Sequence, residues 1–291
     1  MRQLAPSVRQ LIALVLLSLL SGAGGATSAQ DVSLPGRPDS VKFAVVGDTG
    51  TGGRPEYEVG QQMAAAHARF PFELVIMLGD NMYGRQDPQD FVEKFEKPYA
   101  ALLQAGVKFV AALGNHDSQS NRSYKGFNMD GQRYFTYQRG NARFFVLDTN
   151  ALDRPQVAWF ENALKASADD WKIVYFHHPL YSNAGRHGSD VELRVALEPL
   201  LLQYGVNVVF SGHDHVYERL TPQKGITYFV EGASGQLARG DVRRATTTAA
   251  AFDRDHTFIL VEIDGDQLSF ETLSRTGERV DVGVISRRPK S

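Results

Sequence analysis

Short apolar runs alternate with amphipathic segments over most of the chain. Apolar runs that end at Gly, Asn or Asp are typical of buried strands, whereas apolar positions three or four residues apart are typical of helices. This pattern predicts strands over residues 42–48, 72–80, 107–117, 143–149, 172–179 and 206–215. It predicts helices over residues 57–70, 88–104 with an interruption near Pro98, 156–166 and 190–204. Because strands and helices alternate, the pattern favours an α/β domain.

The last third of the chain has a different pattern. Residues 226–232, 256–274 and 279–286 are typical of strands joined by tight turns. The Asp-Gly-Asp sequence at 264–266 is a favourable hairpin turn between two alternating runs. We therefore expect an antiparallel meander at the end of a single domain with mixed sheets over residues 41–291. A separate C-terminal domain is the less favoured alternative, because no linker marks a boundary.

The N-terminus has the pattern of a secretory signal peptide. Two arginines precede a compact apolar run at 11–20, and small residues follow up to Ala29. We expect a signal peptide over residues 1–29, with cleavage after Ala29 or alternatively after Ala26, and a polar linker over residues 30–40. The apolar run is shorter than the roughly 20 residues that span a bilayer. The sequence thus predicts an exported protein, periplasmic or secreted, with no stable membrane anchor after cleavage.

Composition narrows the possible chemistry. The formal net charge is −2, and 43% hydrophobic with 22% charged residues is ordinary for a globular protein. Such a balance offers no broad basic surface, so we expect no nucleic-acid partner. The absence of cysteine excludes disulfides, thiolate nucleophiles, zinc–cysteine sites, iron–sulfur clusters and a lipoprotein anchor. Strong metal ligands must then be His, Asp, Glu, Asn or Tyr.

Polar clusters follow five of the predicted strands. They are Gly47-Asp48, Gly79-Asp80-Asn81, Gly114-Asn115-His116-Asp117, His177-His178-Pro179 and Gly212-His213-Asp214-His215. Because ligands of α/β proteins bind beyond the carboxyl ends of strands, we expect these clusters to meet at one edge. They contain five of the eight histidines, and His187 follows soon after. His67 and His256 lie elsewhere and are expected to be ordinary core or surface residues.

Each cluster taken alone has an ordinary structural explanation. Asp48 after a glycine is a common turn or helix cap, and His213 and His215 have the spacing of one strand face. The whole set differs, because gathered carboxylates repel one another unless cations compensate them. A pair of metal ions removes this penalty and uses every residue type present. Other motifs are incomplete: Pro55 stands where a dinucleotide-binding loop needs Gly, and no serine stands in a nucleophile elbow.

The five clusters, in this order, resemble the calcineurin-like metallophosphoesterase superfamily. Tyr83, three residues after Asp80, makes the chain similar to the purple acid phosphatases, and its short length resembles their small, tartrate-resistant type. The similarity extends through residues 225–235 and so covers most of the chain. It implies a four-layer sandwich of two mixed β-sheets flanked by helices, with the active site at the C-terminal ends of strands.

The resemblance also implies a dinuclear centre of Fe(III) and a divalent metal, which is Fe, Zn or Mn. The implied ligands are Asp48, Tyr83 and His215 for Fe(III), Asp80 as the bridge, and Asn115, His177 and His213 for the divalent metal. His177 rather than His178 fits the family's V-x-x-H block, here residues 174–177. The phenolate of Tyr83 on Fe(III) would absorb visible light, which gives the family its purple colour.

On the substrate side the resemblance implies three catalytic residues. His116 and His187 would face the phosphate, and Asp117 would orient His116. A protonated His116 would stabilise the phosphoryl oxygens or protonate the leaving alkoxide. The chain departs from the family in lacking cysteine and in carrying Ser118 where close relatives can have another histidine.

Together these features predict an exported, metal-dependent phosphoric monoester hydrolase of the acid phosphatase type, in which a metal-bound hydroxide attacks phosphorus. Its substrate would be a phosphorylated small molecule or a phosphoprotein. Two alternatives remain open: a phosphodiesterase on the same scaffold, and a non-catalytic module that binds metal or phosphate. Substrate selectivity is expected to lie in loops such as 122–133 and 235–244.

Overall fold

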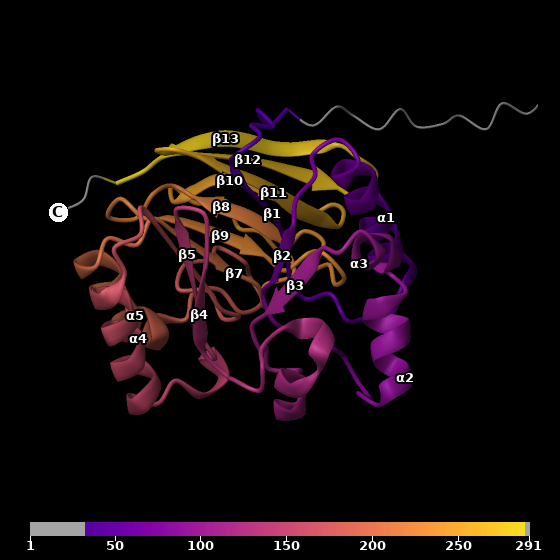
Figure 1. Ribbon diagram of the computed structural model, residues 1–291, viewed down its shortest axis with the longest axis horizontal. Helices are drawn as coiled ribbons and strands as arrows, with labels where there is room; N and C mark the ends of the chain where they lie inside the picture. The colour runs from indigo at the N-terminus through magenta and orange to yellow at the C-terminus, as the bar shows by residue number, and fades with distance from the viewer. Residues whose placement is uncertain (1–32, 289–291) are drawn as a thin grey trace, which may run out of the picture.

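The computed structural model describes residues 33–288 (Figure 1). Its strands are β1 (Val41–Val46), β2 (Leu74–Met77), β3 (Lys108–Ala111), β4 (Phe135–Arg139), β5 (Ala142–Val146), β6 (Trp171–Tyr175), β7 (Val208–Ser211), β8 (Tyr217–Leu220), β9 (Thr227–Glu231), β10 (Thr248–Phe252), β11 (Thr257–Asp264), β12 (Gln267–Ser274) and β13 (Arg279–Ser286). Its α-helices are α1 (Arg54–His67), α2 (Pro88–Phe91), α3 (Ala100–Gln104), α4 (Arg154–Ala166) and α5 (Val191–Gln203). Helical turns of other types are η1 (Val92–Glu96), η2 (Gln119–Ser123), η3 (Lys125–Phe127) and η4 (Thr149–Ala151).

The strands form two mixed sheets, which confirms the expected architecture. The first has the order β13-β12-β11-β1-β2-β3, in which β1, β2 and β3 are parallel to one another. The second has the order β10-β8-β9-β7-β6-β5-β4, in which β5, β6, β7 and β9 are parallel. Helices α1 to α3 lie on one side of this pair of sheets and α4 and α5 on the other (Figure 1). The molecule therefore has four layers.

Three apolar cores separate these layers. In β1, Phe43 and Val45 pack into the core between the sheets, whereas Ala44 and Val46 pack towards α1 and α3. The third core joins the second sheet to α4 and α5 through residues such as Phe160. A strand covered on both faces carries a nearly continuous apolar run, which is why the sequence identifies the central strands well.

One strand lies in a different place from the one expected. The sequence predicts residues 226–232 within the C-terminal meander, but β9 pairs in parallel with β7 in the second sheet. All five residues of β9 are buried, as a central strand requires. Its apolar run indicates a strand but does not reveal which neighbour it pairs with. The meander consists of β11, β12 and β13, with the predicted turn between β11 and β12.

The sequence reading missed β4, β8 and β10. β4 and β10 are the two edges of the second sheet, and β8 is next to an edge. β10 has the sequence TAAAF, and alanine has little preference for strands. β8 has the sequence YERL, in which two charged residues interrupt the apolar pattern. Edge positions place weaker demands on hydrophobicity, so their signal is weak.

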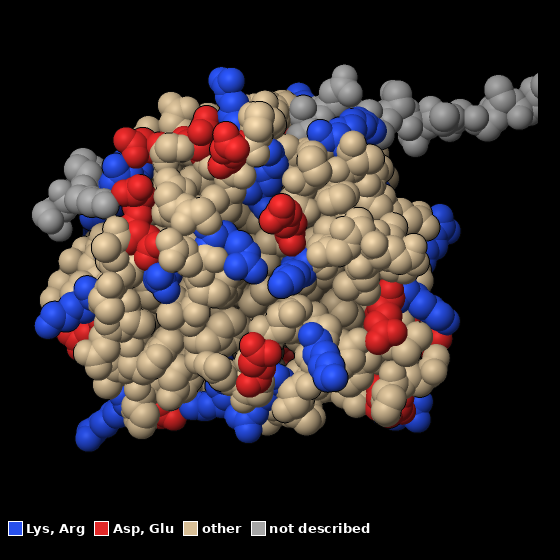
Figure 2. Space-filling view, in the orientation of Figure 1, with Lys and Arg blue, Asp and Glu red and all other residues tan. Residues whose placement is uncertain are grey.

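The described part of the predicted linker, residues 33–40, is held against the first sheet. Glu262 of β11 accepts hydrogen bonds from the backbone N–H groups of Gly36 and Arg37. The predicted signal peptide, residues 1–29, lies outside the described part of the chain. Within that part, none of the helices is both long and apolar enough to cross a membrane. Acidic and basic side chains are interspersed over the face that Figure 2 shows.

Candidate metal centre

The loops that follow β1, β2, β3, β6 and β7 meet at one edge of the two sheets. Hydrogen bonds show that these loops are in contact. The backbone N–H of His213 donates to Asp48 Oδ2 at 2.9 Å. The backbone N–H of His116 donates to Asp80 Oδ1 at 2.8 Å. Three of these loops come from the first sheet and two from the second. The five polar clusters therefore share one site, as predicted from their positions after strands.

Asp48, Asp80, Tyr83 and His215 form one half of this site. The Tyr83 hydroxyl oxygen lies 3.2 Å from Asp48 Oδ1, and it lies 2.9 Å from Asp80 Oδ2. The same oxygen is 3.3 Å from His215 Nε2, which is itself 3.4 Å from Asp48 Oδ1. A phenol has a single proton, so it cannot donate to all three neighbours at once. Both carboxylates are buried, so oxygen and nitrogen lone pairs are concentrated around one point.

Asn115, His177 and His213 form the other half. Nδ1 of His177 lies 3.0 Å from the carbonyl oxygen of Leu78, which can only accept, so Nδ1 carries the ring proton. Nε2 of the neutral ring is then an acceptor, yet it lies 2.9 Å from Asn115 Oδ1 and 3.4 Å from Asp80 Oδ1. Nδ1 of His213 is 3.1 Å from the same nitrogen. The atoms that can offer lone pairs, Asn115 Oδ1, His177 Nε2 and His213 Nδ1, therefore lie close together, as the ligands of one cation do.

Asp80 contacts both halves. One carboxylate oxygen lies near the Tyr83 hydroxyl and the other near His177 Nε2, which is the position that a bridging ligand needs. Asp80, Asp48 and His213 also have left-handed backbone conformations, with φ values of 50°, 54° and 70°. Residues other than glycine rarely adopt such angles, and strain of this kind is concentrated at functional sites.

The bare site is electrostatically unfavourable. Burial and the neighbouring Asp80 carboxylate raise the pKa of Asp48 well above its ordinary value. Burial lowers the pKa of His177, and burial together with the adjacent His177 lowers the pKa of His213 to about 2. The imidazoles are therefore neutral, which is the form that binds metals, and the close carboxylates repel each other. This donor set fits metal ions.

Two glycines make the close packing of these side chains possible. A Cβ atom on Gly114 would lie 2.2 Å from Asp80 Oδ1, and a Cβ atom on Gly212 would lie 2.4 Å from Asp48 Oδ2. Both distances are shorter than any real contact. Gly114 and Gly212 are therefore required, because Asp80 and Asp48 occupy the space where their side chains would be.

Either of the two adjacent histidines His177 and His178 could be the metal ligand that follows β6. Ring nitrogens of His177, His178 and His213 lie within 4.8 Å of one another. However, Nδ1 of His178 lies 2.9 Å from the hydroxyl oxygen of Thr149, at the outer side of the cluster. The contact of His177 with Asn115 favours His177, which stays our predicted ligand.

The model of the calcineurin-like phosphoesterase family matches residues 41–217, more than half of the chain. The chain belongs to this family. Rattus norvegicus tartrate-resistant acid phosphatase type 5 is 28% identical to this phosphoesterase over 86% of the chain and 92% of its own length. Arabidopsis thaliana purple acid phosphatase 17 is 28% identical over 73% of the chain and 74% of its own length. These matches confirm a purple acid phosphatase-like metallophosphoesterase.

Solved structures show the same fold. Purple acid phosphatase PPD1 from yellow lupin seeds superposes with a TM-score of 0.71 and 20% identity, covering 87% of this phosphoesterase and 55% of that chain. GAP50, described as the anchor in the inner membrane complex of Plasmodium, superposes with a TM-score of 0.77 and 16% identity, covering 86% and 90%. Both comparisons concern the fold alone.

The phosphoesterase holds two further histidines beside the centre. Nε2 of His116 lies 4.0 Å from Asp80 Oδ2, and the side chain is 52% exposed. Its ring centre is 4.7 Å from that of Tyr83. The ring centre of His187 is 4.3 Å from that of His213. The two predicted substrate-side histidines thus lie next to different halves of the site, and both are exposed to solvent.

Asp117 joins two loops of the site. Its carboxylate accepts hydrogen bonds from the backbone N–H groups of Asn81, Met82 and Gly114 and from the side-chain amides of Asn81 and Asn121. Withdrawal from water raises its pKa to about 7. These contacts join the loop after β2 to the loop after β3, which also carries His116. Asp117 therefore lies where it can hold the loop of its neighbour His116 in position.

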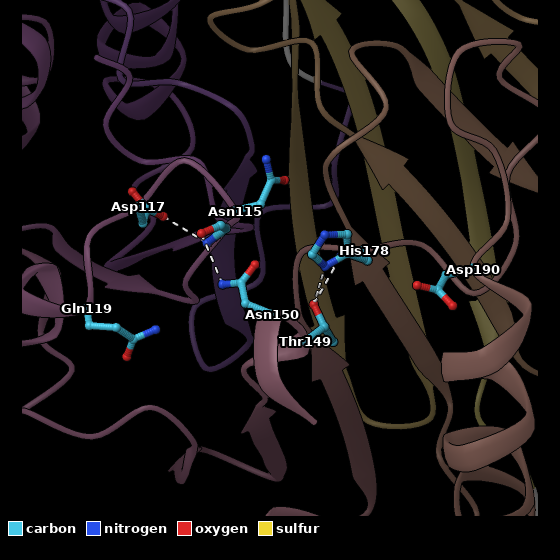
Figure 3. A pocket seen from close by; sticks show the side chains of 8 residues that line it. Asn115, Asp117, Gln119, Thr149, Asn150, His178 and Asp190 are labelled. Atoms are coloured by element: carbon cyan, nitrogen blue, oxygen red, sulfur yellow. Dashed lines mark hydrogen bonds between the residues drawn. The ribbon is translucent and has the colours of Figure 1, made fainter. Parts of the chain in front are cut away.

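A sixth strand end contributes to the site and was missed in the sequence. β5 is followed by Asp148, Thr149 and Asn150, and the Asn150 side chain donates to the Gly114 carbonyl at 3.0 Å. Thr149 contacts His178 (Figure 3). A signal was present, because this segment is also a polar cluster after an apolar strand. It contains neither histidine nor glycine, so it does not stand out as a candidate ligand segment.

The two histidines expected to be ordinary lie outside the centre. His67 is in the last turn of α1 and packs edge-on against Phe72. The ring of His256 is hydrogen-bonded to the Ala233 carbonyl. Both contacts are those of structural residues.

Proposed function

We propose that this chain is an exported dinuclear-metal phosphatase that hydrolyses phosphomonoesters. The family match and the acid phosphatase names of its relatives support a phosphoric monoester hydrolase. Asp48, Tyr83 and His215 would hold Fe(III), and Asp80 would bridge to the second ion. Asn115, His177 and His213 would hold the divalent metal, which is Fe, Zn or Mn. Nitrogen and oxygen ligands of this kind suit all three divalent ions.

The observation that carries this proposal is the contact between His177 Nε2 and Asn115 Oδ1. The Leu78 carbonyl fixes the ring proton on Nδ1, so two acceptors lie 2.9 Å apart. Two acceptors this close repel each other unless a cation lies beside them. A metal ion would accept a lone pair from each.

The residues around the centre have separate tasks. When bound, the metal ions would neutralise the phosphate charge and activate water as the nucleophile. His116, exposed beside Asp80, is placed to hold a phosphoryl oxygen or to deliver a proton from Nε2 to the leaving alkoxide. His187 approaches from the His213 side and contributes a second contact to the phosphate. Asp117 keeps the loop of His116 in place.

The test is hydrolysis of p-nitrophenyl phosphate by the purified protein and by Asp80→Asn. We expect turnover by the wild type and a loss of at least about 100-fold in kcat for the variant, since misplacement at a reacting centre has effects of this size. Asp130→Asn is the matched control, because Asp130 has the same φ of 50° and is exposed. It should retain wild-type activity.

Other outcomes identify the alternatives. Faster hydrolysis of bis(p-nitrophenyl) phosphate than of the monoester would establish a phosphodiesterase instead. A wild-type protein that contains two metal ions but hydrolyses neither ester would establish a binding module.

Export is part of the proposal and rests on the signal-peptide pattern of residues 1–29. N-terminal sequencing of protein recovered outside the cytoplasm should give a chain that begins after Ala29 or after Ala26. Recovery of the uncleaved chain from the cytoplasm alone would contradict export.

A further inference from the structure

A cavity of about 380 Å³ opens beside the metal centre (Figure 3). Asn115, the predicted ligand of the divalent ion, forms part of its wall. The other walls come from three segments: Gln119 of η2, Thr149 and Asn150 of η4, and His178 and Asp190 between β6 and α5. The cavity therefore begins at the centre and extends away from it, and its size suits a small molecule.

Its walls are polar and carry acidic but no basic charge. Among the described residues that line it are two carboxylates, those of Asp117 and Asp190, and there is no Lys, Arg, Phe, Tyr or Trp. Asp117 already accepts five hydrogen bonds from the loops around it. Asp190 is therefore the charged group that a molecule in the cavity meets.

Only one of the two carboxylate oxygens of Asp190 is used as a hydrogen-bond acceptor by the described residues. Oδ1 accepts a hydrogen bond from the backbone N–H of Leu193 and so caps α5. The backbone N–H of Asp190 donates to the Pro179 carbonyl, which fixes the position of Asp190. Within residues 33–288, Oδ2 has no hydrogen-bond partner. A fixed carboxylate with a free oxygen can accept from a hydroxyl or an ammonium group and repels an anion.

We propose that this cavity receives the alcohol portion of the phosphomonoester and that Asp190 determines its specificity. Asp190 favours a small alcohol whose far end is neutral or cationic over one whose far end is anionic. This inference rests on the proposed phosphatase function, which places the phosphate at the centre next to Asn115. Among the described residues that line the cavity there is no Phe, Tyr or Trp, so a nucleoside base would have only the His178 ring to stack on.

The test compares three substrates of similar size that differ in charge at the far end: ethanolamine phosphate, glycerol 1-phosphate and 3-phosphoglycerate. For the wild type we expect kcat/KM to be about tenfold higher for the first two than for 3-phosphoglycerate, as one partly solvated charge contact suggests. In Asp190→Asn this preference should fall to about twofold, because the amide keeps the helix cap but removes the charge.

Asp153→Asn is the matched control. Asp153 caps α4 as Asp190 caps α5, accepts from the backbone N–H of Gln156 and does not line the cavity. This variant should keep the wild-type order of the three substrates. A change in its preference as large as that of Asp190→Asn would overturn the proposal, since the effect would then not depend on the cavity.

The remaining outcomes distinguish a failure of the proposed phosphatase function from a failure of the specificity role of Asp190. No hydrolysis of any of these esters or of p-nitrophenyl phosphate by the wild type would overturn the phosphatase function and this inference with it. Hydrolysis with the same preference in the wild type and in Asp190→Asn would overturn the specificity role alone. A wild-type preference for 3-phosphoglycerate would also overturn it and would indicate that the alcohol lies towards Arg186, on the His215 side of the centre.

Discussion

At the scale of single residues, the site depends on how little space surrounds each ligand. Asp48 is fully buried, its Oδ1 lies near Tyr83 and its Oδ2 accepts from the backbone N–H of His213. Gly212 lies directly against the same carboxylate. Such a side chain has one available position, so a change of a single atom beside it changes the geometry of the centre.

Gly212→Ala should displace the Asp48 carboxylate, because the new Cβ would lie 2.4 Å from Oδ2. We expect a loss of about 100-fold in kcat/KM for p-nitrophenyl phosphate, the size of effect that a displacement of 1 Å can have. Gly53→Ala is the control: its φ is −82° and its Cβ would meet no atom closer than 3.3 Å. Equal activity of the two variants would show that the site tolerates a displaced Asp48.

At the scale of elements, the centre is formed by loops, and the strands that precede these loops fix their positions. Asp117 shows how this is done, because its carboxylate binds the loop after β2 to the loop after β3. Asn150 then connects the loop after β5 to the loop after β3. The predicted ligands lie close together because these connections bring together strand ends from both sheets.

Asp117→Asn should weaken the junction of the two loops. An amide nitrogen in place of Oδ2 would face the N–H groups of Gly114 and Asn81, leaving buried donors without acceptors. We expect a decrease of about 1–3 kcal/mol in the free energy of unfolding and a lower metal content. Urea unfolding and elemental analysis measure the two effects. Asp87→Asn, which keeps the exposed cap of α2, should change neither, and an equal loss there would contradict the explanation.

Sequence alone predicted the elements whose burial is strongest. β1, β2, β3, β6 and β7 end in polar clusters after buried apolar runs, so both the strands and their meeting point could be predicted. The individual ligands were predicted only with the help of the resemblance to purple acid phosphatases. Tyr83 is the residue that most specifically indicates this family. β9 was placed with the wrong neighbours, because an apolar run does not identify its pairing partner.

Asp190 illustrates a second feature that could not be predicted from the sequence alone. A sequence identifies an aspartate before a helix as a cap, and here it is one. That Asp190 also lines a cavity beside Asn115 depends on how β3, β5 and β6 lie next to one another in space. Thr149 and Asn150 were missed for the same reason, since their contacts join segments far apart in the chain.

At the scale of the whole molecule, the two sheets are also joined by a buried polar contact. Glu231 at the end of β9 accepts from the hydroxyl of Thr257 at the start of β11, with distances of 2.8 and 3.0 Å to its two oxygens. Burial raises the pKa of Glu231 to about 8. This carboxyl therefore stays protonated in the folded protein over a range in which the unfolded chain ionises.

A pH-dependent stability follows. Below about pH 4.5, Glu231 is protonated in both states and contributes no pH dependence; as the pH rises towards 8 the unfolded chain alone loses the proton, so stability falls. The loss is at most about 5 kcal/mol, from 1.4 kcal/mol for each unit of pKa shift. Urea unfolding of the metal-free protein at several pH values should show a smaller decline in Glu231→Gln. An unchanged pH dependence would contradict this assignment.

The central claim is that this chain holds two metal ions between the loops of its two sheets. Elemental analysis of the purified, folded wild-type protein tests it most directly. We predict about two ions per chain, at least one of them iron, because one half of the site offers a phenol with carboxylates and the other offers imidazoles with an amide. A folded protein that contains no stoichiometric metal, and takes up none when Fe, Zn and Mn are supplied, would contradict the claim.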